Sequence, residues 1–150
     1  MTDFDDFEGL DDASRAGLRT LTGDMQQHGA ERDAPIRTVF GLLGDRWSTL
    51  ILLLLNIGPF RHALMRRLLD RLSAEGRISQ RVLTLKLRQL ERNGLVVRSV
   101  SDDVPPKVGY ALTPLGAELV AEARRLLGWV QQNRTRIEQA RAAFDAAEED

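Results

Sequence analysis

The sequence predicts a mainly α fold with a small β-hairpin: a winged helix-turn-helix with extra N- and C-terminal helices that serve dimerisation. Three features of the 150 residues predict this class. Leucines recur at helical spacing through the middle of the chain, a short Val-rich hairpin with paired prolines follows them, and a long helix with an apolar stripe comes last. We therefore expect one compact domain with further helices at its ends.

The elements ahead of the hairpin are predicted from apolar spacing and end signals. Pro35 suits the first turn of a helix that Gly44 ends, and Asp45 can cap the next helix. That next helix carries the longest apolar run, residues 47–57, which Gly58-Pro59 stops, so we expect it at the centre of the core. The other expected elements are a helix at 13–27, a short strand at 60–61 and a helix at 62–72 with Leu64, Leu68 and Leu72 on its buried face.

The helix expected after Ser79 has two contrasting faces. Ser79 can cap its N-terminus through the hydroxyl, and Asn93-Gly94 forms a left-handed stop. The face expected to be buried repeats at i, i+4 and i+7 and consists of Leu83, Leu87 and Leu90. The opposite face is cationic and consists of Arg81, Arg88 and Arg92, with Gln80 and Thr84 near the N-terminal end.

A hairpin is expected directly after this helix. Residues 95–101 and 108–112 are strand-like, and the turn between them contains Pro105-Pro106. Arg98 and Lys107 would then lie beside the cationic helix, where they could reach phosphates or a minor groove. Because the same pattern also fits an ordinary solvated helix and hairpin, periodicity and charge alone leave DNA contact open.

The order of motifs resembles the HxlR family of bacterial winged-helix transcription regulators. The resemblance covers residues 34–130 and rests on several matching segments. They are Pro35, Gly44-Asp45-Arg46-Trp47, Ile51 to Leu55, Ile78-Ser79-Gln80-Arg81-Val82-Leu83-Thr84, Asn93-Gly94-Leu95-Val96, Val104-Pro105-Pro106 and Tyr110-Ala111-Leu112-Thr113-Pro114-Leu115-Gly116. The resemblance implies a DNA-binding regulator whose recognition helix enters the major groove.

Three positions depart from the family pattern. Ala34 stands where many members have a cysteine, and the 150 residues contain none, so the family's thiol-based sensing cannot be carried over. Leu85 lies in the middle of the cationic face, where it either packs on a thymine methyl or covers a neighbouring helix. The connection in 68–77 is longer than the family's usual short turn.

Charge is distributed unevenly along the chain. The formal net charge is -1, yet residues 1–33 hold nine acidic and three basic side chains and residues 135–150 hold five and two. That leaves 16 basic and 8 acidic residues between these ends, so the central part can bind a polyanion. We expect an acidic, flexible tail at 1–12, an N-terminal helix and linker at 13–33, and the winged helix at 34–113.

The last helix is expected to begin at Pro114 with Thr113 as its cap and to run to Phe144, before an acidic tail at 145–150. Its apolar stripe would consist of Leu115, Leu119, Leu126, Val130 and Ile137. A helix of residues 114–144 is too long for so small a domain to cover. We therefore expect it to pair with its equivalent in a homodimer, helped by the N-terminal helices.

Several function classes lack support in the sequence. There is no cysteine nucleophile and no glycine-rich phosphate loop, and His28 and His62 occupy unlike contexts, so we expect no enzyme, no cofactor and no metal site. The first twelve residues do not form a signal peptide, and no apolar run reaches the ~20 residues of a membrane span. We expect a cytoplasmic protein. Trp47 and Trp129 belong either to the core or to the pocket of an unknown small-molecule effector.

The expected partner is double-stranded DNA carrying a near-palindromic operator. Arg81 and Arg88 are the first candidates for base or phosphate contacts, and Arg98 and Lys107 for wing contacts. The candidates for hydrogen bonds to base edges or backbone are Ser79, Gln80 and Thr84. The alternative is a winged-helix module that binds an acidic protein and no DNA.

Overall fold

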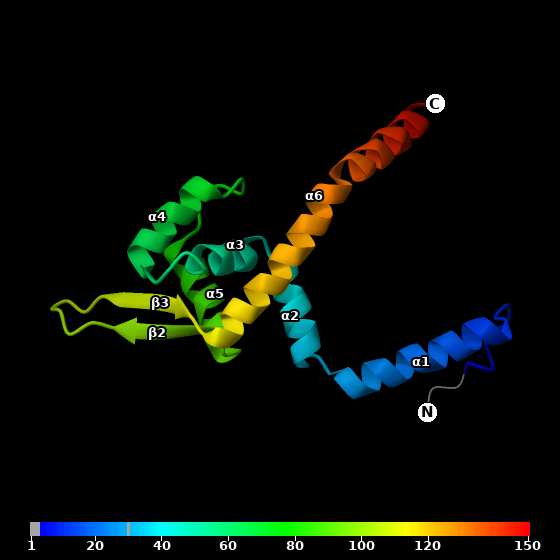
Figure 1. Ribbon diagram of the computed structural model, residues 1–150, viewed down its shortest axis with the longest axis horizontal. Helices are drawn as coiled ribbons and strands as arrows, with labels where there is room; N and C mark the ends of the chain where they lie inside the picture. The colour runs from blue at the N-terminus through cyan, green and yellow to red at the C-terminus, as the bar shows by residue number, and fades with distance from the viewer. Residues whose placement is uncertain (1–3, 30) are drawn as a thin grey trace. The chain divides into compact units, whose positions relative to one another are not determined.

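The computed structural model describes residues 4–29 and 31–150, in which six helices and three strands are found (Figure 1). In chain order the elements are α1 (Asp12–His28), α2 (Pro35–Gly44), α3 (Arg46–Leu55), β1 (Phe60–Arg61), α4 (His62–Leu72), α5 (Gln80–Arg92), β2 (Val96–Val100), β3 (Val108–Leu112) and α6 (Pro114–Glu149). The mainly helical winged helix-turn-helix prediction is confirmed. The chain divides into an N-terminal unit, residues 1–44, and a C-terminal unit, residues 45–150.

The N-terminal unit consists of α1, α2 and the segment before them. Asp11 caps α1 by accepting a hydrogen bond from the Ser14 backbone N–H at 2.7 Å. The preceding acidic segment is bound to the helix: Arg19 pairs with Asp5 at 3.1 Å, and Arg15 donates to the Phe7 carbonyl at 3.2 Å. Residues 1–3 of the acidic tail and residue 30 of the linker expected from the sequence lie outside the described residues.

The core of the C-terminal unit is built from one face of each of its helices. The expected central helix is confirmed, since α3 buries four large apolar residues, Ile51, Leu52, Leu54 and Leu55. The predicted inner face of α5 is also confirmed and consists of Leu83, Leu87 and Leu90, all fully buried. Burial of this leucine row against α3 places the cationic face of α5 toward solvent.

The predicted inner face of α4 is wrong by one position along the helix. Met65 and Leu69 are its fully buried residues, whereas Leu64 is 40% exposed and Leu72 57% exposed. Both sets repeat at i, i+4, so apolar spacing alone does not distinguish them. In the observed rotation Leu64 and Arg67 both point outward, and both line an open groove beside α5 and the wing.

The small sheet has the strand order β1-β3-β2, with both pairs antiparallel. β2 and β3 form the predicted hairpin, and the expected strand at 60–61 adds a third strand by pairing Phe60 with Tyr110. At the end of the hairpin, the Ser101 N–H donates to the Lys107 carbonyl and the Lys107 N–H to the Ser101 hydroxyl, both at 2.9 Å. We call β2, β3 and this turn the wing.

The first turn of α6 is attached to the junction of α5 and β2. Thr113 caps α6, as predicted, and its hydroxyl donates to the Gly94 carbonyl at 2.6 Å. Gly116 then passes so close to the chain at Leu95 that a Cβ at this position would collide with the Leu95 carbonyl oxygen. This close approach explains the need for glycine three residues after the threonine.

Only the beginning of α6 contributes to the core. Its buried residues are Gly116, Val120 and Ala123, and none after Ala123 is buried. Three members of the predicted apolar stripe, Leu115, Leu126 and Val130, are exposed in the single chain, so the domain leaves most of this helix uncovered, as expected from its length. The helix also continues past the predicted end at Phe144 to Glu149, since the Ala- and Glu-rich residues 145–149 favour helix and include no Gly or Pro.

None of the helices in residues 4–29 and 31–150 has both the length and the apolarity to cross a bilayer. Only the separate helices α2 and α3, counted together, would meet both requirements.

A single carboxylate joins α3 to α5. One oxygen of Asp45 caps α3 by accepting hydrogen bonds from the Ser48 N–H at 2.8 Å and the Ser48 hydroxyl at 2.7 Å. The other oxygen accepts from Lys86 of α5 at 2.8 Å. Burial raises the pKa of Asp45, but the hydrogen bonds from Lys86 and Ser48 outweigh it, so the pKa lies below its ordinary value.

Replacing Asp45 should therefore destabilise the fold in a pH-dependent way. Asp45→Ala should lower the free energy of unfolding by about 2 kcal/mol at pH 7, mainly through loss of the cap. Asp45→Asn should keep most of the cap and lose the ion pair, which costs about 1 kcal/mol or less. Because the folded-state pKa is depressed, the advantage of wild type over Asp45→Asn should be complete above about pH 4 and shrink as the pH falls further. Urea titrations between pH 3 and 7 measure this; a gap that is independent of pH would contradict the ionic contribution.

Two glycines of α6 offer a matched comparison. Gly116→Ala should destabilise the C-terminal unit by about 1–3 kcal/mol because the new methyl group meets backbone atoms. Gly128→Ala meets nothing within 4 Å and should stabilise the helix by up to about 1 kcal/mol. Thermal unfolding of both variants checks this, and equal stabilisation by the two substitutions would refute the close approach at Leu95.

Candidate nucleic-acid interface

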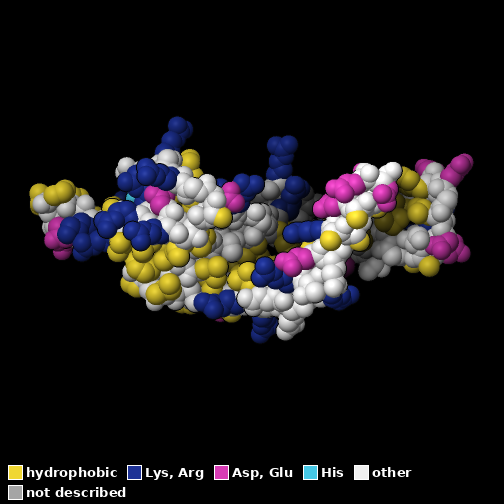
Figure 2. Space-filling view, turned by 90° about the horizontal axis from the view of Figure 1, so that it is seen from above, with side chains coloured by type: hydrophobic (Ala, Val, Ile, Leu, Met, Phe, Trp, Pro, Cys, Tyr) yellow, Lys and Arg dark blue, Asp and Glu magenta, His cyan; other side chains and the backbone are white. Residues whose placement is uncertain are grey.

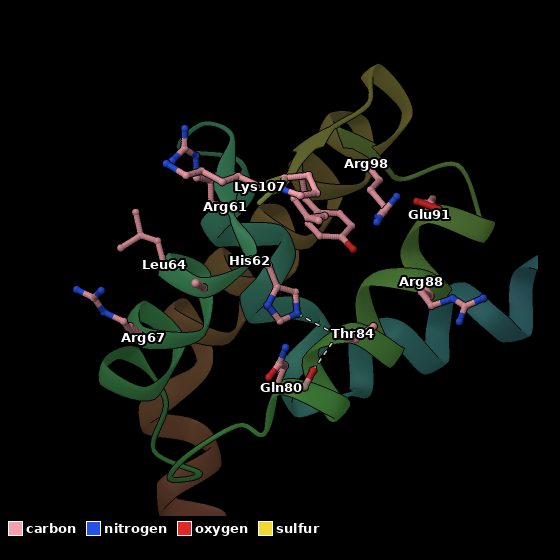
Figure 3. A pocket seen from close by; sticks show the side chains of 14 residues that line it. Arg61, His62, Leu64, Arg67, Gln80, Thr84, Arg88, Glu91, Arg98 and Lys107 are labelled. Carbon is pink, nitrogen blue, oxygen red and sulfur yellow. Dashed lines mark hydrogen bonds between the residues drawn. The ribbon is translucent and has the colours of Figure 1, made fainter. Parts of the chain in front are cut away.

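An open groove of about 1010 Å³ runs between the start of α4, the outer face of α5 and the wing (Figure 3). Five basic side chains line it: Arg61, Arg67, Arg88, Arg98 and Lys107. Gln80, His62 and Thr84 add polar groups, and Glu91 is the one carboxylate among the lining residues. A concave surface with this excess of positive charge fits a polyanion.

The N-terminal end of α5 is held firmly where it meets this groove. The Ser79 hydroxyl accepts a hydrogen bond from the Val82 N–H at 3.1 Å, which confirms the predicted cap. One residue earlier, the buried Ile78 donates its backbone N–H to the Asp70 carboxylate of α4 at 2.8 Å. The long connection between α4 and α5 is further bound to α3, because Glu75 pairs with Arg46 at 2.6 Å. These contacts position the first turns of α5 relative to the core.

The structure brings five of the seven predicted site residues to the groove. Its wall contains Gln80, Thr84 and Arg88 from α5 together with Arg98 and Lys107 from the wing. Arg81 lies outside the groove, on the adjoining outer surface of α5, which it shares with Gln80, Thr84, Leu85 and Arg88. Ser79 lies at the helix start, with its hydroxyl oxygen engaged as the cap.

Leu85 is 55% exposed and shares the outer surface of α5 with Arg81 and Arg88. The alternative in which Leu85 covers a neighbouring helix is therefore wrong for the single chain. An exposed leucine between two arginines, on the face that carries the polar groups, can contact an apolar group of a bound molecule.

Sequence reasoning missed the contribution of α4 and β1 to the groove. Arg61 and Arg67 line the groove but were not among the candidates. The usable signal was the basic run at 66–67 on α4, the helix before α5. Lys86 illustrates the reverse case, since this basic residue of α5 is bound to Asp45 and does not line the groove.

His62 was also missed, and it is linked to the recognition helix. Its Nε2 lies 3.0 Å from the Thr84 hydroxyl, which donates in turn to the Gln80 carbonyl at 2.9 Å (Figure 3). The His62 and Tyr110 rings lie with their centroids 6.5 Å apart. Burial lowers the pKa of His62, and the positive charge of Arg66 lowers it further. The imidazole is therefore mainly neutral at pH 7.

The space-filling view of Figure 2 shows where charge gathers on the C-terminal unit. Lys and Arg side chains cluster toward the left, where α4 and the wing lie. The far end of the wing is different, because the exposed residues Asp102, Asp103 and Val104 carry no positive charge. The basic side chains of the wing that line the groove are Arg98, in the middle of β2, and Lys107, where the turn meets β3.

Comparison with known proteins finds close matches to this arrangement. The model of the family described as HxlR-like helix-turn-helix matches residues 42–138. The uncharacterized HTH-type transcriptional regulator YdeP of Bacillus subtilis is 36% identical over 112 residues, which cover 75% of this chain and 83% of YdeP.

Solved structures agree in fold as well as in sequence. A transcriptional regulator named ytfH from Salmonella typhimurium has a TM-score of 0.60 and 30% identity, covering 75% of this chain and 95% of that chain. The redox regulator HypR in its reduced form has a TM-score of 0.58 and 33% identity, covering 70% of this chain and 98% of its own. With its recognition helix, three-stranded sheet and long final helix, the chain belongs to the HxlR-like helix-turn-helix family of transcriptional regulators, which are not enzymes.

Proposed function

We propose that the protein is a sequence-specific DNA-binding regulator that acts as a homodimer on a near-palindromic operator. In this proposal α5 enters the major groove, and Arg98 and Lys107 of the wing contact the neighbouring backbone or minor groove. The observation that carries it is the groove itself, which five basic side chains from α4, β1, α5 and the wing line beside the polar N-terminal half of α5. A regulator of this kind acts where the chromosome lies, so we place it in the cytoplasm.

The residues divide by the contacts they suit. Arg81, Gln80 and Leu85 lie on the outer surface near the start of α5, the part of a recognition helix that reads base edges. Arg61, Arg67 and the wing residues flank that surface, where phosphates on either side of the major groove would pass. In this division, α5 would recognise the base sequence directly. The phosphate contacts of Arg61, Arg67 and the wing residues would supply most of the salt-dependent affinity.

Exposed apolar surface supports the dimer. Large apolar side chains on α6 beyond the core contacts remain open to solvent: Leu126, Leu127, Trp129 and Val130. Trp129 is 55% exposed, so the first of its two alternatives, packing in the core, does not hold for the single chain. A contiguous helical face of this size is stabilised when a second copy covers it. The α5 helix and wing of each subunit, together called its reading head, would then contact half-sites about 34 Å apart on one face of the duplex.

Control of this regulator would not use a thiol. The 150 residues contain no cysteine, and Ala34 is a buried residue of the N-terminal unit whose carbonyl begins the hydrogen bonding of α2. HypR is described as a redox regulator, and a redox response that depends on cysteine cannot be transferred to this chain. A non-covalent small-molecule effector remains compatible with this chain, and it would act by binding one arrangement of the reading heads better than another.

Selection of bound fragments from random duplex DNA with the purified protein tests the central claim. It should return a near-palindromic site bound at least ~10³-fold more tightly than random DNA, with affinity that falls steeply as salt rises. On that site Arg81→Ala should cost about 1–3 kcal/mol and relax the preference at one base pair of each half-site. Arg134→Ala is the control, because Arg134 lies on α6 and pairs with Glu138 at 2.8 Å. If no sequence is enriched, the protein-interaction alternative takes the place of this function.

The dimer is tested separately from DNA binding. Trp129→Glu places a charge on the exposed apolar face of α6 and should shift the protein from dimer to monomer at micromolar concentration. Gln131→Glu adds the same charge at an exposed polar position of the same helix and should leave the dimer intact. Sedimentation velocity measures both variants, and a monomeric wild-type protein at this concentration would exclude the proposed assembly.

A further inference from the structure

His62 lies outside the recognition helix, yet it is hydrogen-bonded to it inside the proposed DNA groove. Two bonds meet at the Thr84 hydroxyl: one with His62 Nε2 at 3.0 Å and one to the Gln80 carbonyl at 2.9 Å. A hydroxyl has a single proton, and Thr84 donates it to Gln80. In that arrangement Nε2 is the donor toward Thr84, in the tautomer that leaves Nδ1 as the nitrogen that gains or loses a proton.

This arrangement changes what Thr84 can offer to DNA. Its proton is used within the helix and one lone pair is used by His62, so the hydroxyl retains a lone pair and the side chain retains its methyl group. An acceptor suits the amino groups of adenine and cytosine, and a methyl group suits the methyl of thymine. Guanine presents only acceptors, N7 and O6, in the major groove. Thr84 held in this way should therefore disfavour guanine.

We propose that His62 is a positioning residue for base readout: by donating from Nε2 it fixes Thr84 as an acceptor, and by taking a second proton on Nδ1 it adds a positive charge to the groove. The inference rests on the proposed DNA-reading function and names a specificity-determining contact within it. It also assigns separate tasks to the two ring nitrogens, so protonation strengthens DNA binding without breaking the bond to Thr84.

The surroundings of His62 set when that second proton binds. The cationic groups near it come from β1 and α4, from α5 and from the wing: Arg61, Arg66, Arg67, Arg88, Arg98 and Lys107. Glu91 is the carboxylate on the same groove, and the Tyr110 ring lies on the sheet side. Burial and the Arg66 charge hold the pKa of His62 below its ordinary value of 6.5. DNA phosphates entering the groove would favour the charged form, so binding should take up protons below neutral pH.

The first test uses the full chain and the duplex that it selects from a random pool. Wild type should discriminate against guanine at one position of each half-site, and His62→Ala should weaken that discrimination about two- to tenfold, the size of one hydrogen bond. His62→Gln should retain it, because the amide nitrogen of glutamine can donate from nearly the place of Nε2. Thr84→Val should remove the discrimination, and adding His62→Ala to it should change nothing further.

Independent, additive effects of His62→Ala and Thr84→Val would overturn the positioning role, as would unchanged guanine discrimination in His62→Ala. Thermal unfolding of each variant shows whether the fold is kept, and His62→Gln provides a folded comparison if His62→Ala is unstable. If the wild-type protein selects no site at all, the proposed function fails and this inference fails with it. If it selects a site and the His62 variants read that site like wild type, only the inference fails.

The pH profile tests the second nitrogen, and a purely structural histidine would not produce it. Wild-type affinity should rise as the pH falls from 7.5 to 5.5, by at most about tenfold per pH unit for each reading head, with a steeper dependence on salt. His62→Gln should lose this rise while keeping its base preference. His28→Ala is the control, since it removes the other histidine of the chain, and it should keep the wild-type profile. A rise that persists in His62→Gln would overturn the charge assignment.

Discussion

The Asp45 carboxylate holds the recognition helix in register with the core. One of its oxygens caps the N-terminus of α3 by accepting a hydrogen bond from the Ser48 N–H. The other accepts a hydrogen bond from Lys86 in the middle of α5. The leucine row of α5 fixes which face turns inward, but apolar contacts alone allow a helix to slide along its axis. The ion pair between Asp45 and Lys86 resists that sliding because it joins one position of α5 to one position of α3. Asp70 of α4 has a similar effect at the start of α5, because its carboxylate accepts a hydrogen bond from the backbone N–H of Ile78, two residues before the helix. The presentation of Gln80, Arg81 and Thr84 depends on these two carboxylates.

Much of the reading head could be predicted from local sequence signals because local chemistry determines those features. Ser79, Asp45 and Thr113 cap helices through their own side chains, and Gly94 adopts a positive φ of 75° after α5. Such signals act over three or four residues and need no knowledge of the fold. The inner face of α5 was equally clear, because Leu83, Leu87 and Leu90 repeat at i, i+4 and i+7, whereas Leu85 has no leucine three or four positions away.

The errors arose where two apolar sets compete or where contacts are distant in sequence. On α4, Leu64-Leu68-Leu72 and Met65-Leu69 have the same spacing, and only packing against other elements, β1 and β3 among them, decides which set is buried. On α6 the core positions were not predicted: the close approach at Leu95 requires Gly116 and turns Val120 inward, while the stripe expected to face a second copy stays exposed. His62 reaches Thr84 across 22 positions of sequence, so no motif at either residue reveals the contact.

The attachment of α6 to the reading head has a mechanical consequence. Thr113 and Gly116 fasten the helix to the backbone at Gly94 and Leu95, directly after the recognition helix ends. The 36 residues of α6 make a rod of about 54 Å, and this rod turns together with α5. In an assembly paired around residues 126–130, about 18 Å of helix separates the pairing surface from Gly116, so a tilt of about 5° there would displace the attachment point of α6 by about 1.6 Å. A signal received at that surface would thus alter the spacing of two heads through leverage, without loosening either recognition helix.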